Sequence, residues 1–119
     1  VSFTRVVTLN DIEREVARAS SQGQVVMLDL YADWCVACKE FEAFTFTDPK
    51  VQAQMSTMHL LQVDMTDNTT ADIEIMEKFQ VLGLPTMLFF DAKGRELTRQ
   101  RVTGFMGAKA FSNHLNGIL

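Results

Sequence analysis

The two cysteines of this sequence, Cys35 and Cys38, lie where an apolar run gives way to a helical pattern. The apolar run, Val25 to Tyr31, is typical of a buried strand. A helical pattern then begins at Cys35, with Cys38 and Phe41 following at spacings of three residues. A cysteine pair at such a strand-to-helix junction is the arrangement used for thiol–disulfide exchange. We therefore interpret the pair as redox-active.

Two other interpretations of the cysteine pair stay open. A purely structural disulfide would add little, because closing so short a loop constrains the unfolded chain only weakly. A structural zinc site needs about four ligands, and the remaining candidates, His59 and His114, are far away with no ligand-like spacing. We expect no metal, while a metal half-site and an inert pair remain alternatives.

Strand and helix patterns alternate along the rest of the chain. Expected strands cover residues 3–7, 25–31, 60–64, 87–90 and about 96–103, and a hairpin turn at 91–94 joins the last two. Expected helices begin near residues 10, 35, 48, 70 and 108. This order predicts an α/β fold, with a parallel sheet covered by helices on both faces and antiparallel strands added at one side.

Local patterns refine the helices. Asn10, with Glu13 three residues later, predicts an N-cap and a capping box for the first helix. In the helix near residue 70, Ile73, Met76 and Phe79 are expected to face inward. Two phenylalanines after the cysteines, at positions 44 and 46, are expected in the core or at a helix end.

Length and charge limit the function classes. The chain has 119 residues, which fits one domain, residues 1–119. Its net charge of −4 argues against a nucleic-acid-binding surface. The longest apolar stretch, Val81 to Phe90, is about half a membrane span, so we expect no direct membrane insertion. Because the sequence starts at Val1 and shows no signal-peptide pattern, we interpret it as a domain excised from a larger protein.

Two segments carry a family resemblance. Residues 34–39, Trp-Cys-Val-Ala-Cys-Lys, follow a strand, and Gly-Leu-Pro-Thr at 83–86 precedes another; together they resemble thioredoxin. Residues 28–42, 81–90 and 101–106 more closely resemble the C-terminal periplasmic domain of the DsbD family of bacterial thiol:disulfide interchange proteins. Thioredoxins usually carry Gly-Pro between the cysteines, whereas this chain carries Val-Ala. The resemblance spans nearly the whole chain and implies a thioredoxin-like fold, a central mixed β-sheet with helices on both faces.

The resemblance also implies a function. In that family the domain takes electrons from the membrane-embedded domain of the same protein. It passes them to an immunoglobulin-like N-terminal domain that reduces periplasmic partners, including those of cytochrome c biogenesis. The electrons come ultimately from NADPH through cytoplasmic thioredoxin, and no cofactor is needed beyond the cysteine disulfide. The implied location is the periplasm, as a monomeric domain of an inner-membrane protein.

The two cysteines are expected to have different roles. Cys35 lies at the helix start, where free N–H groups and the helix dipole favour a thiolate, so we predict that it is the partly exposed nucleophile. Cys38 lies one turn further along and should be more buried. We predict that it attacks Cys35 to resolve a mixed disulfide.

Two acids are expected near the pair. Asp29 lies in the middle of an apolar strand, where an unpaired carboxylate is costly, and we predict that it exchanges a proton with Cys38. Thioredoxin has an acid at the matching position and a nearby lysine, where this chain has Gln62. The pKa of Asp29 should therefore be raised. Glu42 shares a helix face with both cysteines, and together the two acids should oppose the effect of the helix dipole on Cys35.

A partner-binding surface is expected around the cysteines. The resemblance implies that the Leu84–Pro85 peptide bond is cis and faces the pair. The backbone of Leu84 could then pair with an extended partner segment. Trp34 should offer a flat contact surface beside Val36 and Ala37, although core packing is an alternative for the tryptophan.

Two other functions remain to be distinguished. A stand-alone thioredoxin-like disulfide reductase would share the same chemistry. A non-catalytic or metal-binding interaction module would not, and stoichiometric zinc that is lost in Cys35→Ser would favour it.

Overall fold

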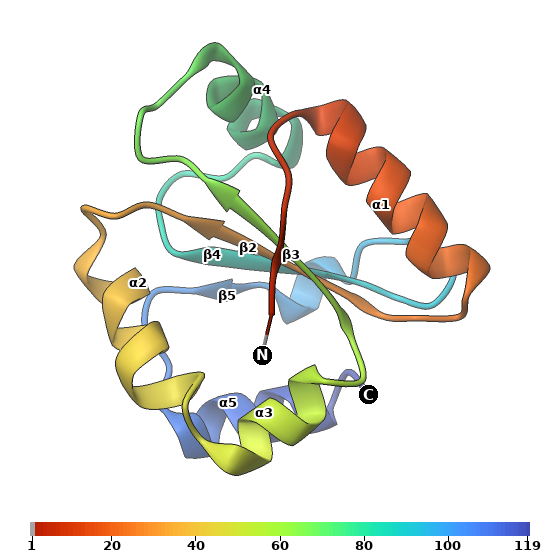
Figure 1. Cartoon of the computed structure of the whole chain (residues 1–119), viewed down its shortest axis with the longest axis vertical. Coiled ribbons are helices and arrows are strands. Elements are labelled where there is room, and N and C mark those ends of the chain that lie inside the picture. Colours follow the sequence, from red (N-terminus) through yellow and green to blue (C-terminus); the bar gives the residue numbers. More distant parts are fainter. Residues whose placement is uncertain (1) are drawn as a thin grey trace.

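The structure, a computed structural model, describes residues 2–119. A five-stranded sheet lies between two layers of helices (Figure 1). The strands are β1 (Thr4–Arg5), β2 (Val26–Tyr31), β3 (His59–Asp64), β4 (Thr86–Phe90) and β5 (Val102–Thr103). The helices are α1 (Leu9–Ser21), α2 (Val36–Glu40), α3 (Pro49–Met55), α4 (Thr70–Phe79) and α5 (Ala108–Asn116), with a π-helical turn η1 (Phe41–Thr45) and a 3-10 turn η2 (Thr98–Gln100).

The sheet is mixed, with strand order β1-β3-β2-β4-β5. Strands β1, β3 and β2 run parallel, whereas β4 runs antiparallel to β2, and β5 antiparallel to β4. Parallel neighbours need a crossover connection, and α1 and α3 lie in those connections. The predicted α/β architecture, with antiparallel strands at one side, is confirmed.

Successive side chains of β2 point to opposite faces of the sheet and therefore pack against different helices. All six residues of β2 are buried, as expected for a strand covered on both faces. Leu28 and Leu30 pack in the cluster that includes α1 and α4 residues. Met27 packs on the other face, with residues of η1, α3 and α5. Because successive side chains point to opposite faces, Asp29 shares the face of Met27, and Figure 1 shows α2 on that side of the sheet.

The predicted cap of the first helix is wrong by two residues. Thr8 is the N-cap: its hydroxyl accepts the N–H of Asp11 at 3.1 Å, and Asp11 Oδ2 accepts the N–H of Thr8 at 3.0 Å. Asn10 therefore lies inside the first turn and Glu13 caps nothing. The hydrogen bonds from the backbone of Thr8 and Val7 lower the pKa of Asp11 to about 2.

The predicted strand at 96–103 is also mostly wrong. Only an isolated bridge, Phe90 to Glu96, and the short β5 pair with β4, and η2 lies between them. Arg101 explains the compact connection. Its guanidinium donates to Glu96 Oε2 at 2.6 Å and to the carbonyl of Phe79 at 2.8 Å, so this segment is tied to α4 as well as to itself.

Two apolar side chains are exposed: Ile73, which was predicted to face inward, and Phe44, which was expected in the core or at a helix end. Ile73 is 42% exposed, and Ile75 lies in the core instead, because α4 presents Asp72 and Ile75 three residues apart as its inner face. Phe44 is 64% exposed, whereas Phe46 is buried. The chain forms a π-helical turn here, whose wider period breaks the 3.6-residue spacing on which the prediction depended.

Candidate redox-active site

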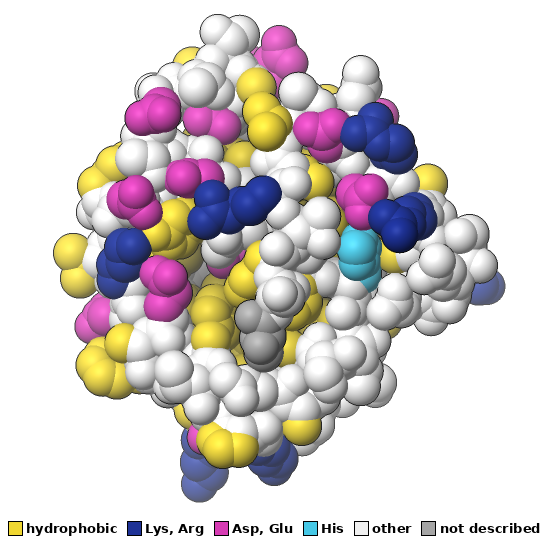
Figure 2. All heavy atoms as spheres, in the orientation of Figure 1, with side chains coloured by type: hydrophobic (Ala, Val, Ile, Leu, Met, Phe, Trp, Pro, Cys, Tyr) yellow, Lys and Arg dark blue, Asp and Glu magenta, His cyan; other side chains and the backbone are white. Residues whose placement is uncertain are grey.

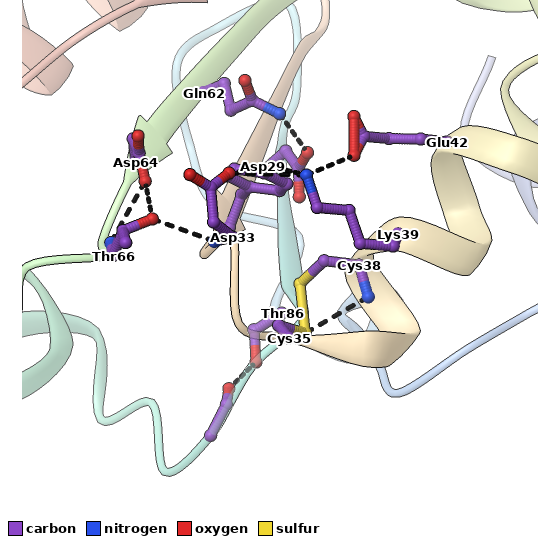
Figure 3. The surroundings of a disulfide bond; sticks show 12 residues. Asp29, Asp33, Cys35, Cys38, Lys39, Glu42, Gln62, Asp64, Thr66 and Thr86 are labelled. Carbon is purple, nitrogen blue, oxygen red and sulfur yellow. Dashed lines mark hydrogen bonds and ion pairs between the residues drawn. A yellow bond between two sulfur atoms is a disulfide. The ribbon is translucent and has the colours of Figure 1, made fainter.

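The two cysteines form a disulfide at the carboxyl end of β2, with their Cα atoms 5.2 Å apart (Figure 3). Cys35 is the N-cap of α2, and its Sγ accepts the backbone N–H of Cys38 at 3.2 Å. The first N–H groups of a helix have no partner inside the helix. The site therefore directs donors at the sulfur of Cys35, which would carry the charge of a thiolate after reduction.

Burial of the pair differs in part from the prediction. Cys35 is 6% exposed and Cys38 is 3% exposed, so Cys38 is the more buried residue, as predicted. The partial exposure predicted for Cys35 is wrong in this disulfide form. Both sulfurs pack with Tyr31 and Ala32, and Leu84 contacts the same cluster from the opposite side.

The start of β4 lies opposite the cysteines because of strand direction. Since β4 runs antiparallel to β2, its first residue, Thr86, pairs with Leu30 near the carboxyl end of β2. The preceding Leu84–Pro85 bond is cis, as the resemblance implied. Gly104 N–H donates to the carbonyl of Pro85 at 3.1 Å. Within residues 2–119 the backbone of Leu84 has no hydrogen-bond partner, which leaves it available to an incoming strand.

Asp29 lies beneath the site and is 3% exposed. Gln62 Nε2 donates to its Oδ2 at 2.9 Å (Figure 3). Burial raises the pKa of Asp29 to about 6; the hydrogen bond from Gln62 lowers it and the charge of Glu42 raises it. The predicted neighbour and the predicted direction of the pKa shift are both confirmed. A carboxyl group of this kind can take and give a proton near neutral pH.

Glu42 lies at the edge of the site on η1, with its side chain 47% exposed. Its Oε1 lies 3.5 Å from Lys39 Nζ. Lys39 also donates to the Tyr31 hydroxyl at 2.5 Å and lies 3.4 Å from Asp33 Oδ1. The hydroxyl of Tyr31 is the largest cause that raises the pKa of Lys39. Lys39 therefore keeps its positive charge beside Glu42.

Tyr31 and Lys39 belong to the site, although sequence reasoning did not single them out. Tyr31 also donates to Asp33, and that hydrogen bond holds the pKa of Asp33 below its usual value. The spacing of Lys39 and Glu42 along one helix face was a usable signal. The contact of Lys39 with Tyr31 depends on how the helix packs on the strand end, which the spacing does not contain.

Apolar side chains surround the disulfide at the surface. Trp34 is 63% exposed and Val36 is 74% exposed, whereas Ala37 is half-buried. The indole Nε1 of Trp34 donates to the carbonyl of Thr66 at 3.1 Å, so the ring is held at the surface by the loop after β3. Core packing, the alternative for Trp34, is wrong. Leu82 is fully exposed, lines the same surface hollow as Leu84 and Pro85, and was not singled out from the sequence.

Both histidines have partners away from the cysteines. His59 Nε2 lies 2.9 Å from Glu15 Oε1, and His114 Nε2 lies 2.7 Å from the carbonyl of Gln100. In the part of the chain that the structure describes, no group of three or more His, Cys, Asp and Glu side chains is arranged to hold a metal ion. No helix in residues 2–119 combines the length and the apolar character needed to cross a membrane.

Curated relatives match the chain along its whole length. The thiol:disulfide interchange protein DsbD of Cronobacter sakazakii is 53% identical over 119 residues, which is 100% of this chain and 20% of that protein. DsbD of Actinobacillus pleuropneumoniae is 56% identical over 116 residues, or 98% of this chain and 20% of the relative. The chain thus spans about a fifth of the length of the curated relatives it matches.

Solved structures share the fold. The oxidised C-terminal domain of DsbD from Neisseria meningitidis superposes with a TM-score of 0.82 at 24% identity, covering 98% of this chain and 100% of that domain. A thioredoxin from Thermus thermophilus gives a TM-score of 0.77 at 21% identity, covering 99% of this chain and 88% of that one. The model of the thioredoxin-like domain family matches residues 12–118. With its disulfide at the start of α2 and a cis-proline opposite, this chain belongs to the thioredoxin-like domain family.

Proposed function

We propose that this chain is the electron-relay domain of a DsbD-type protein and works by dithiol–disulfide exchange. The observation that carries the proposal is the Cys35–Cys38 disulfide at the N-terminus of α2. The 53% identity over the full chain to part of Cronobacter sakazakii DsbD supports the more specific assignment. The cysteine pair is the only redox group that the mechanism requires, and NADPH is the ultimate electron source, through thioredoxin.

The exchange has two halves, in which a donor first reduces this pair and the pair then reduces an acceptor. A donor thiolate attacks Cys35 Sγ, the disulfide breaks, and Cys38 leaves as a thiolate and takes up a proton. The second donor thiol resolves the mixed disulfide, which leaves the donor oxidised and this pair reduced. In the second half, the Cys35 thiolate attacks the acceptor disulfide, Cys38 loses its proton and attacks Cys35, and the acceptor departs as a dithiol.

Asp29 is suited to move the proton of Cys38. In the view of Figure 3 its carboxyl group lies between Gln62 and the cysteine pair. Its raised pKa of about 6 lets it accept the proton when Cys38 attacks and return it when Cys38 leaves. Glu42 contributes by raising the proton affinity of Asp29.

The proposed partners are the transmembrane and N-terminal immunoglobulin-like domains of one inner-membrane protein, with this chain as a single monomeric domain in the periplasm. The exposed Trp34 and Val36 supply apolar contact area next to the disulfide. Leu84, whose backbone has no partner in the described part of the chain, supplies the edge to which an extended partner segment would hydrogen-bond. The half-buried Ala37 packs against the same cluster as the cysteines, and its small side chain permits close approach to them.

The first test of the proposal is to measure the reduction potential of the Cys35–Cys38 pair. Titration in glutathione or dithiothreitol buffers can be followed by the fluorescence of Trp34, the single tryptophan. A donor that passes electrons onward should give roughly −200 to −270 mV, whereas roughly −120 mV would mark a strong oxidant and contradict the relay. Stoichiometric zinc in the purified protein, lost in Cys35→Ser, would instead support a metal-binding module.

Trapping tests the order of the cysteines. We expect Cys38→Ala to accumulate a mixed disulfide through Cys35 with an acceptor disulfide, because no resolving thiol remains. Cys35→Ala should trap much less, since Cys35 is the helix N-cap, where free N–H groups favour the thiolate, and Cys38 lies within the helix. Non-reducing gel electrophoresis with mass spectrometry measures both variants. Equal trapping by the two variants would contradict the assigned roles.

A further inference from the structure

Three side chains from three neighbouring strands form one row across the sheet. Arg5 on β1 is in register with Gln62 on β3, and Gln62 is in register with Asp29 on β2. Residues in register on adjacent strands project from the same face, which here is the face that carries α2. The pairing of the strands therefore connects an exposed arginine to the buried acid beneath the disulfide.

Hydrogen bonds join the row from end to end. Arg5 Nε donates to Gln62 Oε1 at 2.7 Å, and Gln62 Nε2 donates to Asp29 Oδ2 at 2.9 Å. A guanidinium has only donors, so the amide oxygen of Gln62 must face Arg5. The amide NH2 of Gln62 must then face Asp29. This orientation suits an ionised carboxylate, which only accepts hydrogen bonds.

Other contacts hold Arg5 in place, although half of its side chain is exposed. Its Nη1 lies 3.4 Å from Asp64 Oδ2, and its Cζ lies 5.7 Å from the centre of the Tyr31 ring. Acidic and basic side chains are interspersed on the surface between β1 and the start of α2 (Figure 2). Arg5 is therefore fixed by its surroundings in a position to orient Gln62.

The charged groups around Asp29 come from several elements. From η1, Glu42 raises the pKa of Asp29, and from β1, Arg5 lowers it. On β4 the register neighbour is the uncharged Met87. The nearby cysteines of α2 are joined in the disulfide. The charge of Arg5 lowers the pKa of Asp29 across the intervening residue of β3. Lys39 of α2 is paired with Glu42 and Asp33.

We propose that Arg5 is a positioning residue that fixes the orientation of the Gln62 amide and thereby sets the pH at which Asp29 exchanges its proton. The significance for catalysis rests on the proposed function, in which Asp29 serves Cys38. Without Arg5, the amide of Gln62 is free to turn its oxygen toward Asp29. A protonated carboxyl group would then donate to that oxygen, so the protonated form of Asp29 gains a partner.

The experiment follows the carboxyl carbon of Asp29 by NMR during a pH titration of the oxidised chain. Arg5→Met should move the titration midpoint upward by about half a pH unit, because a cation and the amide orientation are both lost. Arg5→Lys keeps a donor and a charge and should restore most of the wild-type midpoint. Arg14→Met removes another exposed arginine, paired with Asp11, and should leave the midpoint of Asp29 unchanged.

A double-variant cycle separates the relayed effect from a direct one. Gln62→Leu should raise the midpoint of Asp29 further than Arg5→Met, and adding Arg5→Met to Gln62→Leu should then raise it by less than in the wild-type background, because only the direct effect of the charge remains. An unchanged midpoint in Arg5→Met would overturn the proposal. An undiminished Arg5 effect in the Gln62→Leu background would also overturn it, since the effect would then act through space.

A further measurement does not depend on the stability of the Gln62 variant. In the wild type Arg5 keeps the NH2 of Gln62 facing Asp29 across the titration, whereas in Arg5→Met the amide can turn when Asp29 is protonated. The side-chain Nε2 resonance of Gln62 should therefore shift further with pH in Arg5→Met than in the wild type. If the pH-dependent shift of Nε2 is no larger in Arg5→Met than in the wild type, the amide has not turned and the proposal fails. All these titrations use the isolated oxidised chain without a partner, so they can fail or succeed independently of the electron-relay function.

Discussion

Asp29 combines a cost to stability with the role in proton transfer that we propose for it. Its side chain is almost fully buried, and Gln62 is the hydrogen-bond partner that the structure gives its carboxylate. Ionisation in this place costs free energy, because the buried charge loses its hydration and only part of that loss is offset. The folded protein therefore holds the proton of Asp29 more tightly than the unfolded chain does.

The stability of the oxidised protein should consequently fall as pH rises through the pKa of Asp29. The stabilisation is fully present below pH 3.8, the ordinary value, and is lost as pH rises through about 6. The loss amounts to about 3 kcal/mol by pH 8. Asp29→Asn should remove this pH dependence in urea unfolding, whereas the exposed control Asp67→Asn should retain it. An identical pH profile in Asp29→Asn would contradict the buried-acid interpretation.

At the scale of single elements, helix starts depend on which side chain reaches the free N–H groups. Thr8 caps α1, Cys35 caps α2 and Asp48 caps α3, each with a side-chain acceptor. The cap at Cys35 belongs to the candidate site, because its acceptor is a sulfur of the disulfide. The cap at Thr8 is structural and shows how sequence patterns can misplace a helix by two residues.

Two alanine variants distinguish the observed cap from the one predicted from sequence. Thr8→Ala should lower the free energy of unfolding by about 1 kcal/mol, because the N–H of Asp11 loses its acceptor. Asn10→Ala should leave stability unchanged or slightly higher, since Asn10 lies within the helix, where alanine is favoured. Chemical denaturation measures both. A larger loss in Asn10→Ala would contradict the cap at Thr8.

At the scale of the whole molecule, an aromatic cluster fixes the helix of the cysteines against the rest of the fold. Phe41 lies one turn after Cys38, and its ring centre is 5.4 Å from that of Phe46 and 5.6 Å from that of Phe111 on α5. These rings pack against the side of the sheet that also carries Asp29. The position of the disulfide over the buried acid therefore depends on packing with the C-terminal helix.

Phe111→Ala should destabilise the protein by about 3–5 kcal/mol, because it leaves a cavity at the centre of this cluster. Phe111 is fully buried, whereas Phe44 is 64% exposed and makes a matched control. Phe44→Ala should change the free energy of unfolding by less than about 0.5 kcal/mol. Denaturant unfolding of both variants measures the difference. Similar losses in the two variants would contradict the observed burial.

Much of the architecture followed from local patterns. The apolar run of β2, the alternation of strands and helices and the cysteine spacing predicted an α/β fold with a redox pair at a strand end, and the structure confirms the fold. The weaker predictions, at 96–103, Ile73 and Phe44, were wrong because a distant partner or a change of helical period decided them. The contact of Arg101 with Phe79 and the π-helical turn at η1 are examples.

The sequence alone determined which groups can carry the chemistry: two cysteines three residues apart, an acid within an apolar strand and a proline before the last long strand. These groups can be recognised from local sequence, because an apolar run indicates a buried strand and the residues after it indicate the start of a helix. Only the tertiary structure decided which side chains contact Asp29. Strand order and register placed Arg5 and Gln62 in one row with Asp29, because side chains from separate strands become neighbours only when the sheet has formed.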